Sequence, residues 1–189
     1  MQYLKEDIQE KILHIAEEVF SEKGYKDASM REIASRTGIT VSNIYHYFTN
    51  KDEIFRTILK PVLNDLYAKI YSHDANQMSI EVFTNSDYQQ ESVQEYIDLV
   101  SEHRARLRML LFQAQGSSLE NFRSEYTDAM TRTIFVFFQG MKQKYPHLNI
   151  GITDFFIQYG MAVCLARRTG AAPREERRNA EIYSRIYSL

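Results

Sequence analysis

Apolar residues recur at three- and four-residue intervals from the start of the chain. The first stripe of this kind consists of Ile8, Ile12, Ile15, Ala16, Val19 and Phe20. Glutamates occupy the opposite side, so the spacing predicts an amphipathic helix with one buried face. Gly24 follows Lys23 at the point where a residue in the left-handed conformation would end this helix.

Two helix-start signals come next along the chain. In the segment Ser29-Met30-Arg31-Glu32, the Ser29 hydroxyl is expected to bind the Glu32 amide while the Glu32 carboxylate reaches back, as in a capping box. The helix that begins there should end at Gly38. Thr40 is the next cap and predicts a short helix that continues to about Phe48.

A longer helix is predicted from Lys51 to Ile70. Asn50 caps it, and the two acidic residues that follow Lys51 favour its first turn. Pro61 lies inside the apolar pattern of this segment. Because proline lacks an amide hydrogen and clashes with the preceding turn, we expect it to kink or split the helix.

The remaining chain is also predicted to be helical, with one polar interruption. Residues 72–91 are weakly periodic and are expected to form a loop with a short helix. Apolar periodicity then marks four further helices, at Val93–Gln115, Leu119–Tyr145, Asp154–Arg168 and Arg174–Leu189. The predicted fold is therefore all-α, with an N-terminal three-helix domain over residues 1–50 and a helical domain over residues 51–189.

The longest wholly apolar run is Ile134 to Phe138. Five apolar residues are too few to cross a bilayer, and on a helix they predict burial on every side. Cys164 is the only cysteine, so an intrachain disulfide is excluded and a reducing compartment is favoured. The charged residues from Met1 to Asp7 lack a secretory apolar region. We therefore expect a cytoplasmic protein without a membrane partner.

The second and third short helices, joined at Gly38-Ile39, have the pattern of a helix-turn-helix. In that motif the second helix exposes small polar side chains near its N-terminus and enters the major groove of DNA. Thr40, Ser42, Asn43 and His46 meet this requirement, whereas Ile39, Ile44 and Phe48 would face the core. Asn43 suits an adenine edge, Val41 a thymine methyl group, and His46 a base or a phosphate. Double-stranded DNA is the predicted partner.

Residues Gly38-Ile39-Thr40-Val41-Ser42-Asn43-Ile44-Tyr45-His46-Tyr47-Phe48-Thr49-Asn50-Lys51 resemble the signature of the tetracycline-repressor (TetR) family. In that signature the recognition helix ends in Tyr-x-x-Phe and a lysine opens the next helix. The resemblance extends upstream through Phe20, Gly24-Tyr25, Ser29-Met30 and Ile33-Ala34, and covers about the first quarter of the chain. It implies a homodimer, a helical second domain with a ligand cavity, and repression that a ligand relieves. Val41 and Ser42 replace a commoner basic-Gly pair, a departure that concerns base preference.

Phosphate contacts are assigned by position. Of Tyr45 and Tyr47, only one can easily face the core, so at least one is expected to reach a phosphate. Lys51 opposes the dipole of its own helix, and phosphate contact is the explanation that the sequence suggests. Arg31 is preferred to Arg36, although both also fit plain solvated charges. The predicted DNA-binding residues are Ser29, Arg31, Thr40, Val41, Ser42, Asn43, Tyr45, His46, Tyr47 and Lys51.

Aromatic and methionine side chains are concentrated in the two helices predicted at Val93–Gln115 and Leu119–Tyr145. Such residues suit a pocket for a small, largely apolar effector, although the same spacing also suits an ordinary core. The predicted ligand-binding residues are Tyr96, Phe112, Tyr126, Met130, Phe137 and Met141. Arg104, Arg106 and Arg108 fit either an acidic ligand or a solvated face.

A dimer interface is predicted on the segment Asp154–Arg168. Small residues one turn apart allow two helices to approach closely there, and larger neighbours supply apolar area. The predicted interface residues are Phe156, Tyr159, Gly160, Val163 and Cys164. A two-fold axis would present two recognition helices to one face of DNA, so the operator should be palindromic.

The alternatives to a ligand-responsive DNA-binding repressor come from other classes of protein. The net charge of −2 favours a helical ligand-binding or interaction protein that does not bind DNA specifically. A small helical enzyme would need a convergent polar site. The five histidines are scattered without metal-ligand spacing, and no glycine-rich phosphate loop is present. We therefore expect no catalysis, no metal and no cofactor.

Overall fold

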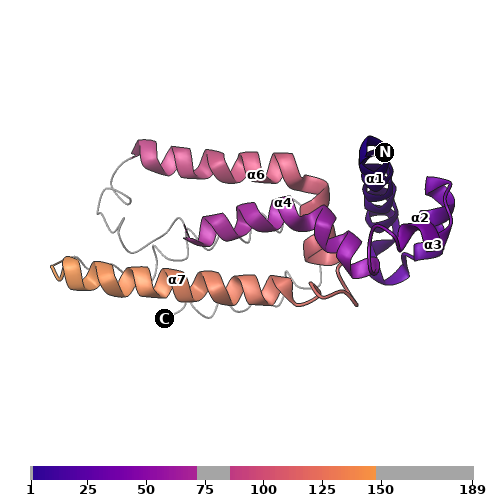
Figure 1. Ribbon diagram of the computed structural model, residues 1–189. Coiled ribbons are helices and arrows are strands. Elements are labelled where there is room, and N and C mark those ends of the chain that lie inside the picture. Colours follow the sequence, from indigo (N-terminus) through magenta and orange to yellow (C-terminus); the bar gives the residue numbers. More distant parts are fainter. Residues whose placement is uncertain (1, 72–85, 148–189) are drawn as a thin grey trace. The chain divides into compact units, whose positions relative to one another are not determined.

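A computed structural model of the chain describes residues 2–71 and 86–147 (Figure 1). The described residues all lie within the first of two compact units, which comprises Met1–Ile150. They form six helices and contain no strand. The helices are α1 (Gln2–Asp27), α2 (Met30–Thr37), α3 (Val41–Ile44), α4 (Lys51–Tyr71), α6 (Ser86–Phe112) and α7 (Phe122–Lys144). The all-α fold class is confirmed, and the domain boundary at residue 50 stays a prediction.

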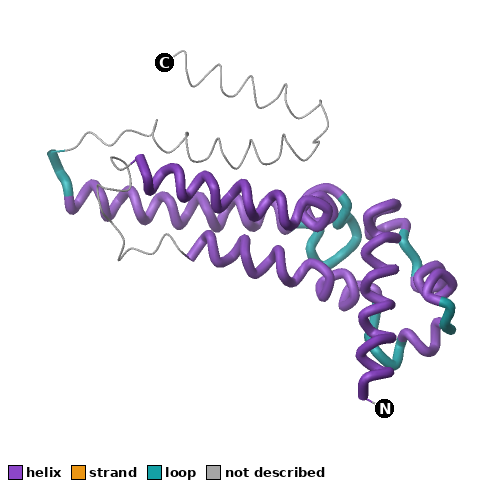
Figure 2. Tube along the Cα trace, turned by 90° about the horizontal axis from the view of Figure 1, so that it is seen from above, coloured by secondary structure: helices purple, strands orange, loops and turns teal. Residues whose placement is uncertain are grey.

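The helices form two packed groups that share one apolar core. Helices α1, α2 and α3 pack on one another, while α4, α6 and α7 lie side by side (Figures 1 and 2). One cluster of buried apolar side chains extends from Ile12 of α1 to Phe122 of α7. Helix α1 contacts both α4 and α6. The first stripe predicted from the sequence therefore faces this core.

The three predicted helix caps are confirmed. The amides of Glu32 and Asn43 donate to the hydroxyl oxygens of Ser29 and Thr40, each at 3.2 Å. The Glu53 amide donates to the Asn50 side-chain oxygen at 2.8 Å. The reciprocal half of the first capping box is wrong, because the Glu32 carboxylate instead accepts from Lys23 and Arg36.

Two predicted helix irregularities have different outcomes. Gly24 interrupts α1 with φ 78° and ψ 168°, which confirms a break at this residue, although a short helical segment continues to Asp27. Pro61 does not split α4, which is assigned as one helix from Lys51 to Tyr71. Helix α3 is shorter than predicted, since it ends at Ile44 and turns lead from there to Phe48.

Helix α6 differs most from its prediction. It begins at Ser86, within the segment that was expected to be mainly a loop, and it ends at Phe112. His103 breaks its regularity, with φ −107° and ψ 19°. The His103 ring is buried, and its Nε2 lies 2.7 Å from Oδ2 of Asp65 on α4, while its Nδ1 has no partner in the described part of the chain.

Helix α7 ends at Lys144, before Pro146, as predicted. The burial predicted on every side of the run from Ile134 to Phe138 is wrong at Val136, because 59% of its surface is exposed. The helices predicted at Asp154–Arg168 and Arg174–Leu189 lie outside the described residues. In the described ranges, no helix combines the length and apolar character needed to cross a membrane.

Candidate nucleic-acid interface

The helix-turn-helix is built around a single left-handed residue. Gly38 ends α2 with φ 80° and ψ 26°, and its amide donates to the carbonyl groups of Ala34 and Ser35. The chain then turns into α3, which Thr40 caps. Ile44 and Phe48 are buried and Ile39 packs against the same core, as predicted. These apolar contacts anchor the short α3 to the apolar core.

The polar residues predicted to read DNA lie together on α3 and its flanking turns. Thr40, Ser42 and His46 are exposed, and Val41 and Asn43 are half-buried. Their proximity follows from their places within seven consecutive residues, all anchored through Ile44. The arrangement exposes hydroxyl and imidazole groups that can donate or accept hydrogen bonds at base edges or phosphates.

Tyr45 and Tyr47 face different environments. Tyr45 is 53% exposed, whereas Tyr47 is half-buried and packs against the apolar core. The expectation that only one of the pair faces inward is therefore confirmed. Tyr45 is the better placed of the two for a phosphate contact, and the contact itself stays a prediction.

The start of α2 separates the two arginines considered from the sequence. Arg31 is exposed and has no ion pair among the described residues. Arg36 binds both carboxylate oxygens of Glu22, at 3.0 and 2.7 Å, and also Glu32 at 2.8 Å. Arg36 lowers the pKa of the Glu22 carboxyl, since the ion pair favours the charged form. The preference for Arg31 as a DNA-contacting group thus gains support, while Ser29 is engaged as a cap.

Lys51 requires a correction. Its ammonium group donates to the carbonyl oxygens of Tyr25 at 2.7 Å and Ala28 at 2.8 Å, and it lies 4.2 Å from the centre of the Tyr25 ring. The argument that only a phosphate explains a lysine at this helix start is therefore wrong. The relevant helix end is that of α1, whose carbonyl groups favour a cation. A phosphate contact by Lys51 stays a prediction.

Several polar contacts join the three-helix group to α6 and to the turn that follows it. Arg106 Nε and Nη2 donate to the two carboxylate oxygens of Glu17, each at 2.9 Å. Of the three arginines on α6, Arg106 therefore has a partner within the protein, whereas Arg104 and Arg108 are exposed. Glu17 and Arg106 carry opposite charges, but the sequence alone does not indicate that they pair, because 89 residues separate them.

The turn between α6 and α7 adds contacts of its own. The Tyr25 amide donates to the Gln113 carbonyl at 2.8 Å, and the Gln113 side chain donates to the Ser21 carbonyl at 3.1 Å. The Ser118 amide donates to Asp52 at 2.8 Å, and Arg56 donates to the Ser118 hydroxyl at 3.1 Å. No local pattern in the sequence announces these contacts, because each joins segments at least 62 residues apart.

The predicted ligand-binding residues lie on α6 and α7, and their contact with a ligand stays a prediction. Met141 is buried, and Tyr96, Met130 and Phe137 are half-buried on α6 and α7. Tyr126 stacks on Phe122 at 5.5 Å and donates to the Leu66 carbonyl at 3.2 Å. Burial raises the pKa of both Tyr96 and Tyr126, because the neutral phenol is favoured away from water.

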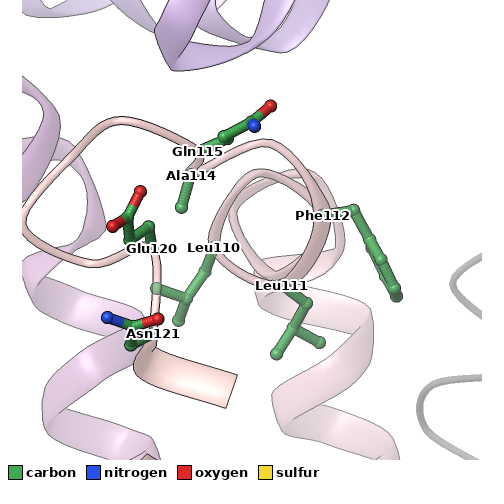
Figure 3. Close-up of a pocket in the computed structure, with 7 residues that line it drawn as sticks. All are labelled: Leu110, Leu111, Phe112, Ala114, Gln115, Glu120 and Asn121. Carbon is green, nitrogen blue, oxygen red and sulfur yellow. The ribbon is translucent and has the colours of Figure 1, made fainter. Parts of the chain in front are cut away.

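A shallow depression of about 230 Å³ lies where α6 gives way to the turn before α7 (Figure 3). Of the predicted ligand-binding residues, only Phe112 lines it. Figure 3 shows Glu120 and Asn121 on one side of the depression and Phe112 on the other. Its volume is below the range of about 300 to 1,000 Å³ that is usual for ligand pockets. The predicted interface residues Phe156, Tyr159, Gly160, Val163 and Cys164 lie outside the described residues.

Comparisons with known proteins agree with this geometry. Residues 12–58 match the family model for bacterial regulatory proteins of the TetR family. The chain is 24% identical over 121 residues to the HTH-type transcriptional repressor KstR2 of Rhodococcus jostii, a match that covers 62% of this chain and 58% of that protein. It is 33% identical over 58 residues to KstR2 of Mycobacterium tuberculosis, which covers 31% of this chain and 29% of that protein. The chain thus matches less than two thirds of either relative's length.

A solved structure extends the likeness of fold beyond the N-terminal helices. A candidate fatty acid metabolism regulator of Clostridium perfringens superimposes with a TM-score of 0.56 at 21% sequence identity, over 84% of this chain and 83% of that one. At this identity the likeness concerns the fold alone. The matched segment 12–58 contains the capped helix-turn-helix and its buried anchor residues. Over that segment, the chain is similar to bacterial regulatory proteins of the TetR family.

Proposed function

We propose that this protein binds double-stranded DNA and regulates transcription as a repressor. The observation that carries the proposal is the surface of α3, where exposed polar side chains stand on a helix anchored by the buried Ile44 and Phe48. A rigid anchor matters because base recognition depends on holding donors and acceptors in register with the groove edges. The repressor assignment is supported by the names of the KstR2 relatives.

Two kinds of contact are proposed on this surface. Asn43 and His46 read base edges, with Val41 beside a thymine methyl group, whereas Tyr45 and Arg31 contact phosphates. The exposure of Tyr45 and the lack of an ion pair at Arg31 in the described ranges support the phosphate assignments. With a net charge of −2, affinity must come from this local placement of groups and not from a basic surface overall.

A homodimer is proposed as the DNA-binding form. Two recognition helices related by a two-fold axis would bind half-sites about 34 Å apart, or a multiple of that distance, on a palindromic operator. The proposed contact involves Gly160 and its neighbours, so a large residue at Gly160 should yield monomers in sedimentation. An unchanged dimer would remove that segment from the interface.

A small, largely apolar molecule is proposed as the effector, bound among α6 and α7. The half-buried aromatic and methionine side chains there support this proposal, since they provide apolar contact area that can adapt its shape. A ligand changes DNA affinity only if it prefers one of two conformers of the protein. Helix α4 joins the two regions, and Pro61 removes one hydrogen bond near its middle, which makes it the proposed site of bending.

Footprinting of the purified protein on DNA that flanks its own gene tests the proposed function. We expect a protected palindrome, and an affinity that falls as salt rises, because phosphate contacts displace counterions. Equal affinity for all duplexes, or none, would favour the alternative of a helical ligand-binding or interaction protein. A cytoplasmic location accompanies the proposal, since the partner is DNA in a bacterial cell.

A further inference from the structure

The ammonium group of Lys51 binds the short connection between α1 and α2. Two of its three N–H donors are used by the carbonyl oxygens of Tyr25 and Ala28, at 2.7 and 2.8 Å. The face of the Tyr25 ring lies 4.2 Å from the same nitrogen. The side chain is thereby half-buried and directed inward at the base of α4.

The surroundings of Lys51 explain why a buried charge is tolerated there. Burial lowers the pKa of the Lys51 ammonium, while the nearby Asp27 carboxylate acts in the opposite direction. The carbonyl groups at the end of α1 and the electron-rich face of Tyr25 both favour a cation at this place. Charge-assisted hydrogen bonds to carbonyl oxygens therefore replace water around the ammonium group.

The groups that Lys51 holds determine how α2 leaves α1. Gly24 has just redirected the chain at φ 78°, and residues 25–28 then connect α1 to the cap of α2 at Ser29. Lys51 binds the first and the last carbonyl of this connection. Because α2 and α3 are joined by the fixed turn at Gly38, holding the connection also sets the position of α3 relative to α4.

We propose that Lys51 is a positioning residue, which fixes the α2–α3 pair to the start of α4 through the Tyr25 and Ala28 carbonyl groups. This inference rests on the proposed function, since it concerns how the DNA-contacting surface is held. The same connection receives a second constraint from outside the three-helix group, because the Tyr25 amide donates to Gln113 at 2.8 Å. Tyr25 is thus the residue at which the turn before α7 contacts the three-helix group, and Lys51 binds the same residue.

A comparison of two DNA duplexes separates positioning from phosphate contact. The first duplex is selected by the wild-type protein from a random pool, and the second is a shuffled duplex of equal length and composition. The variant is Lys51→Met, which keeps much of the side-chain length but removes the ammonium group. Lys26→Met is the matched control, because Lys26 is an exposed lysine on the same connection and has no ion pair in the described residues.

We expect Lys51→Met to weaken binding to the selected duplex by roughly tenfold or more, since misplaced α3 side chains lose base contacts. Its affinity for the shuffled duplex, and the dependence of that affinity on salt, should stay as in the wild type. Lys26→Met should leave the ratio of the two affinities unchanged. All measurements are made well below each variant's thermal midpoint, so that only folded protein is compared.

Other results would overturn the inference. A phosphate contact predicts equal losses on both duplexes, together with a salt-dependence slope that falls by about 0.9. A role in stability alone predicts a lower thermal midpoint with both affinities unchanged. If the wild-type protein selects no duplex and shows no salt-dependent binding, the proposed function fails, and that failure is distinct from either result for Lys51.

Lys51→Arg provides a second variant if Lys51→Met does not fold. Arginine binds phosphate at least as well as lysine does, so a phosphate role predicts full affinity on both duplexes. A positioning role predicts a loss on the selected duplex alone, because a planar guanidinium does not occupy the place of one compact ammonium between two carbonyl groups. Full affinity of Lys51→Arg for the selected duplex would contradict the proposal.

Discussion

The three-helix group of α1, α2 and α3 differs from the long helices α6 and α7 in how its helices are defined. Ser29 and Thr40 each accept a hydrogen bond at the start of a short helix, whereas Asn121 makes no such bond at the start of α7. Core residues of the first group such as Ile12 and Phe20 are fully buried, whereas Val136 of α7 is largely exposed. Short helices need caps and a dense core because they gain little from their own hydrogen bonds.

This contrast separates local from long-range control of structure. In the first group, a cap, a glycine and an apolar stripe each specify the conformation within a few residues. In α6, the irregular residue is His103, and its partner Asp65 lies 38 positions away on α4. The two regions are joined by long-range contacts, such as the ion pair between Glu17 and Arg106.

The largest effect expected from this comparison is the loss of the α4 aromatic ring that packs against α1. Phe55 is fully buried, and its ring centre lies 5.0 Å from those of both Phe20 and Tyr25. We expect Phe55→Ala to lower the free energy of unfolding by about 3 to 5 kcal/mol, through lost burial and the cavity left behind. Urea denaturation measures the change. Val136→Ala on α7 is the control and should stay within about 0.5 kcal/mol.

Two glycines with nearly the same positive φ allow a direct comparison of the regions. Gly38 has φ 80°, and an alanine Cβ at this position would meet no other atom within 4 Å. Gly116, in the turn before α7, has φ 81°, and a Cβ there would lie 4.0 Å from the Tyr25 ring. Neither site is crowded, so alanine should cost about 1 to 2 kcal/mol at each, from the left-handed conformation alone. Thermal or urea unfolding of both variants checks this. A cost at Gly116 near zero would mean that its turn relaxes more easily than the turn at Gly38.

The contact between the regions should have a smaller measurable energy. Arg106 and Glu17 are each about one third exposed at the side chain, 33% and 28%, so solvent weakens their attraction. A double-mutant cycle with Glu17→Ala and Arg106→Ala should give a coupling of about 0.5 to 1 kcal/mol in unfolding experiments. The pair Glu17 and Arg108 serves as the control, because Arg108 is exposed and should show no coupling. Additive effects at Glu17 and Arg106 would indicate that the two regions are not joined by this ion pair.

The smallest expected effect concerns pH and the start of α4. The Thr49 hydroxyl and amide both donate to Oε2 of Glu53 at 2.6 Å, and these bonds lower the pKa of the Glu53 carboxyl below its ordinary 4.5. Because the folded pKa is the lower one, this stabilisation is present above about pH 4.5 and is lost as pH falls through the folded value. Thr49→Ala should therefore reduce the loss of stability on acidification, measured by thermal unfolding at a series of pH values. Thr49→Ser, which keeps the hydroxyl, should behave as the wild type.

The sequence predicts the helices α1, α2 and α3 more completely than α6 and α7, for a physical reason. The caps at Ser29, Thr40 and Asn50 and the break at Gly24 depend on residues within three or four positions of each other, so their patterns are legible in the sequence. The same patterns predict which residues of α3 face outward. They do not decide which of Tyr45 and Tyr47 is exposed, and the structure shows that it is Tyr45.

The errors arise where a side chain has a distant partner. The local sequence does not explain Lys51 at a helix start, because the carbonyl groups of Tyr25 and Ala28 that it binds lie 26 and 23 residues earlier. The sequence does not predict that α6 begins as early as Ser86, because the polar residues there are compatible with either a solvated helix or a loop. The sequence predicts that Pro61 kinks or splits α4, and the split is wrong, because the helix continues through Pro61 and packs on α1, α6 and α7.

The hydrogen bonds that join Gln113 to Tyr25 and Ser21 of α1 have a consequence for protein engineering. Hybrid regulators are made by grafting the N-terminal helices of one protein onto the effector domain of another, with a junction chosen near the end of the first domain. Here a junction at residue 50 would separate both Tyr25 and Ser21 from Gln113. A graft that also carries the turn containing Gln113 would keep both hydrogen bonds, so the transplantable unit of this protein is discontinuous in sequence.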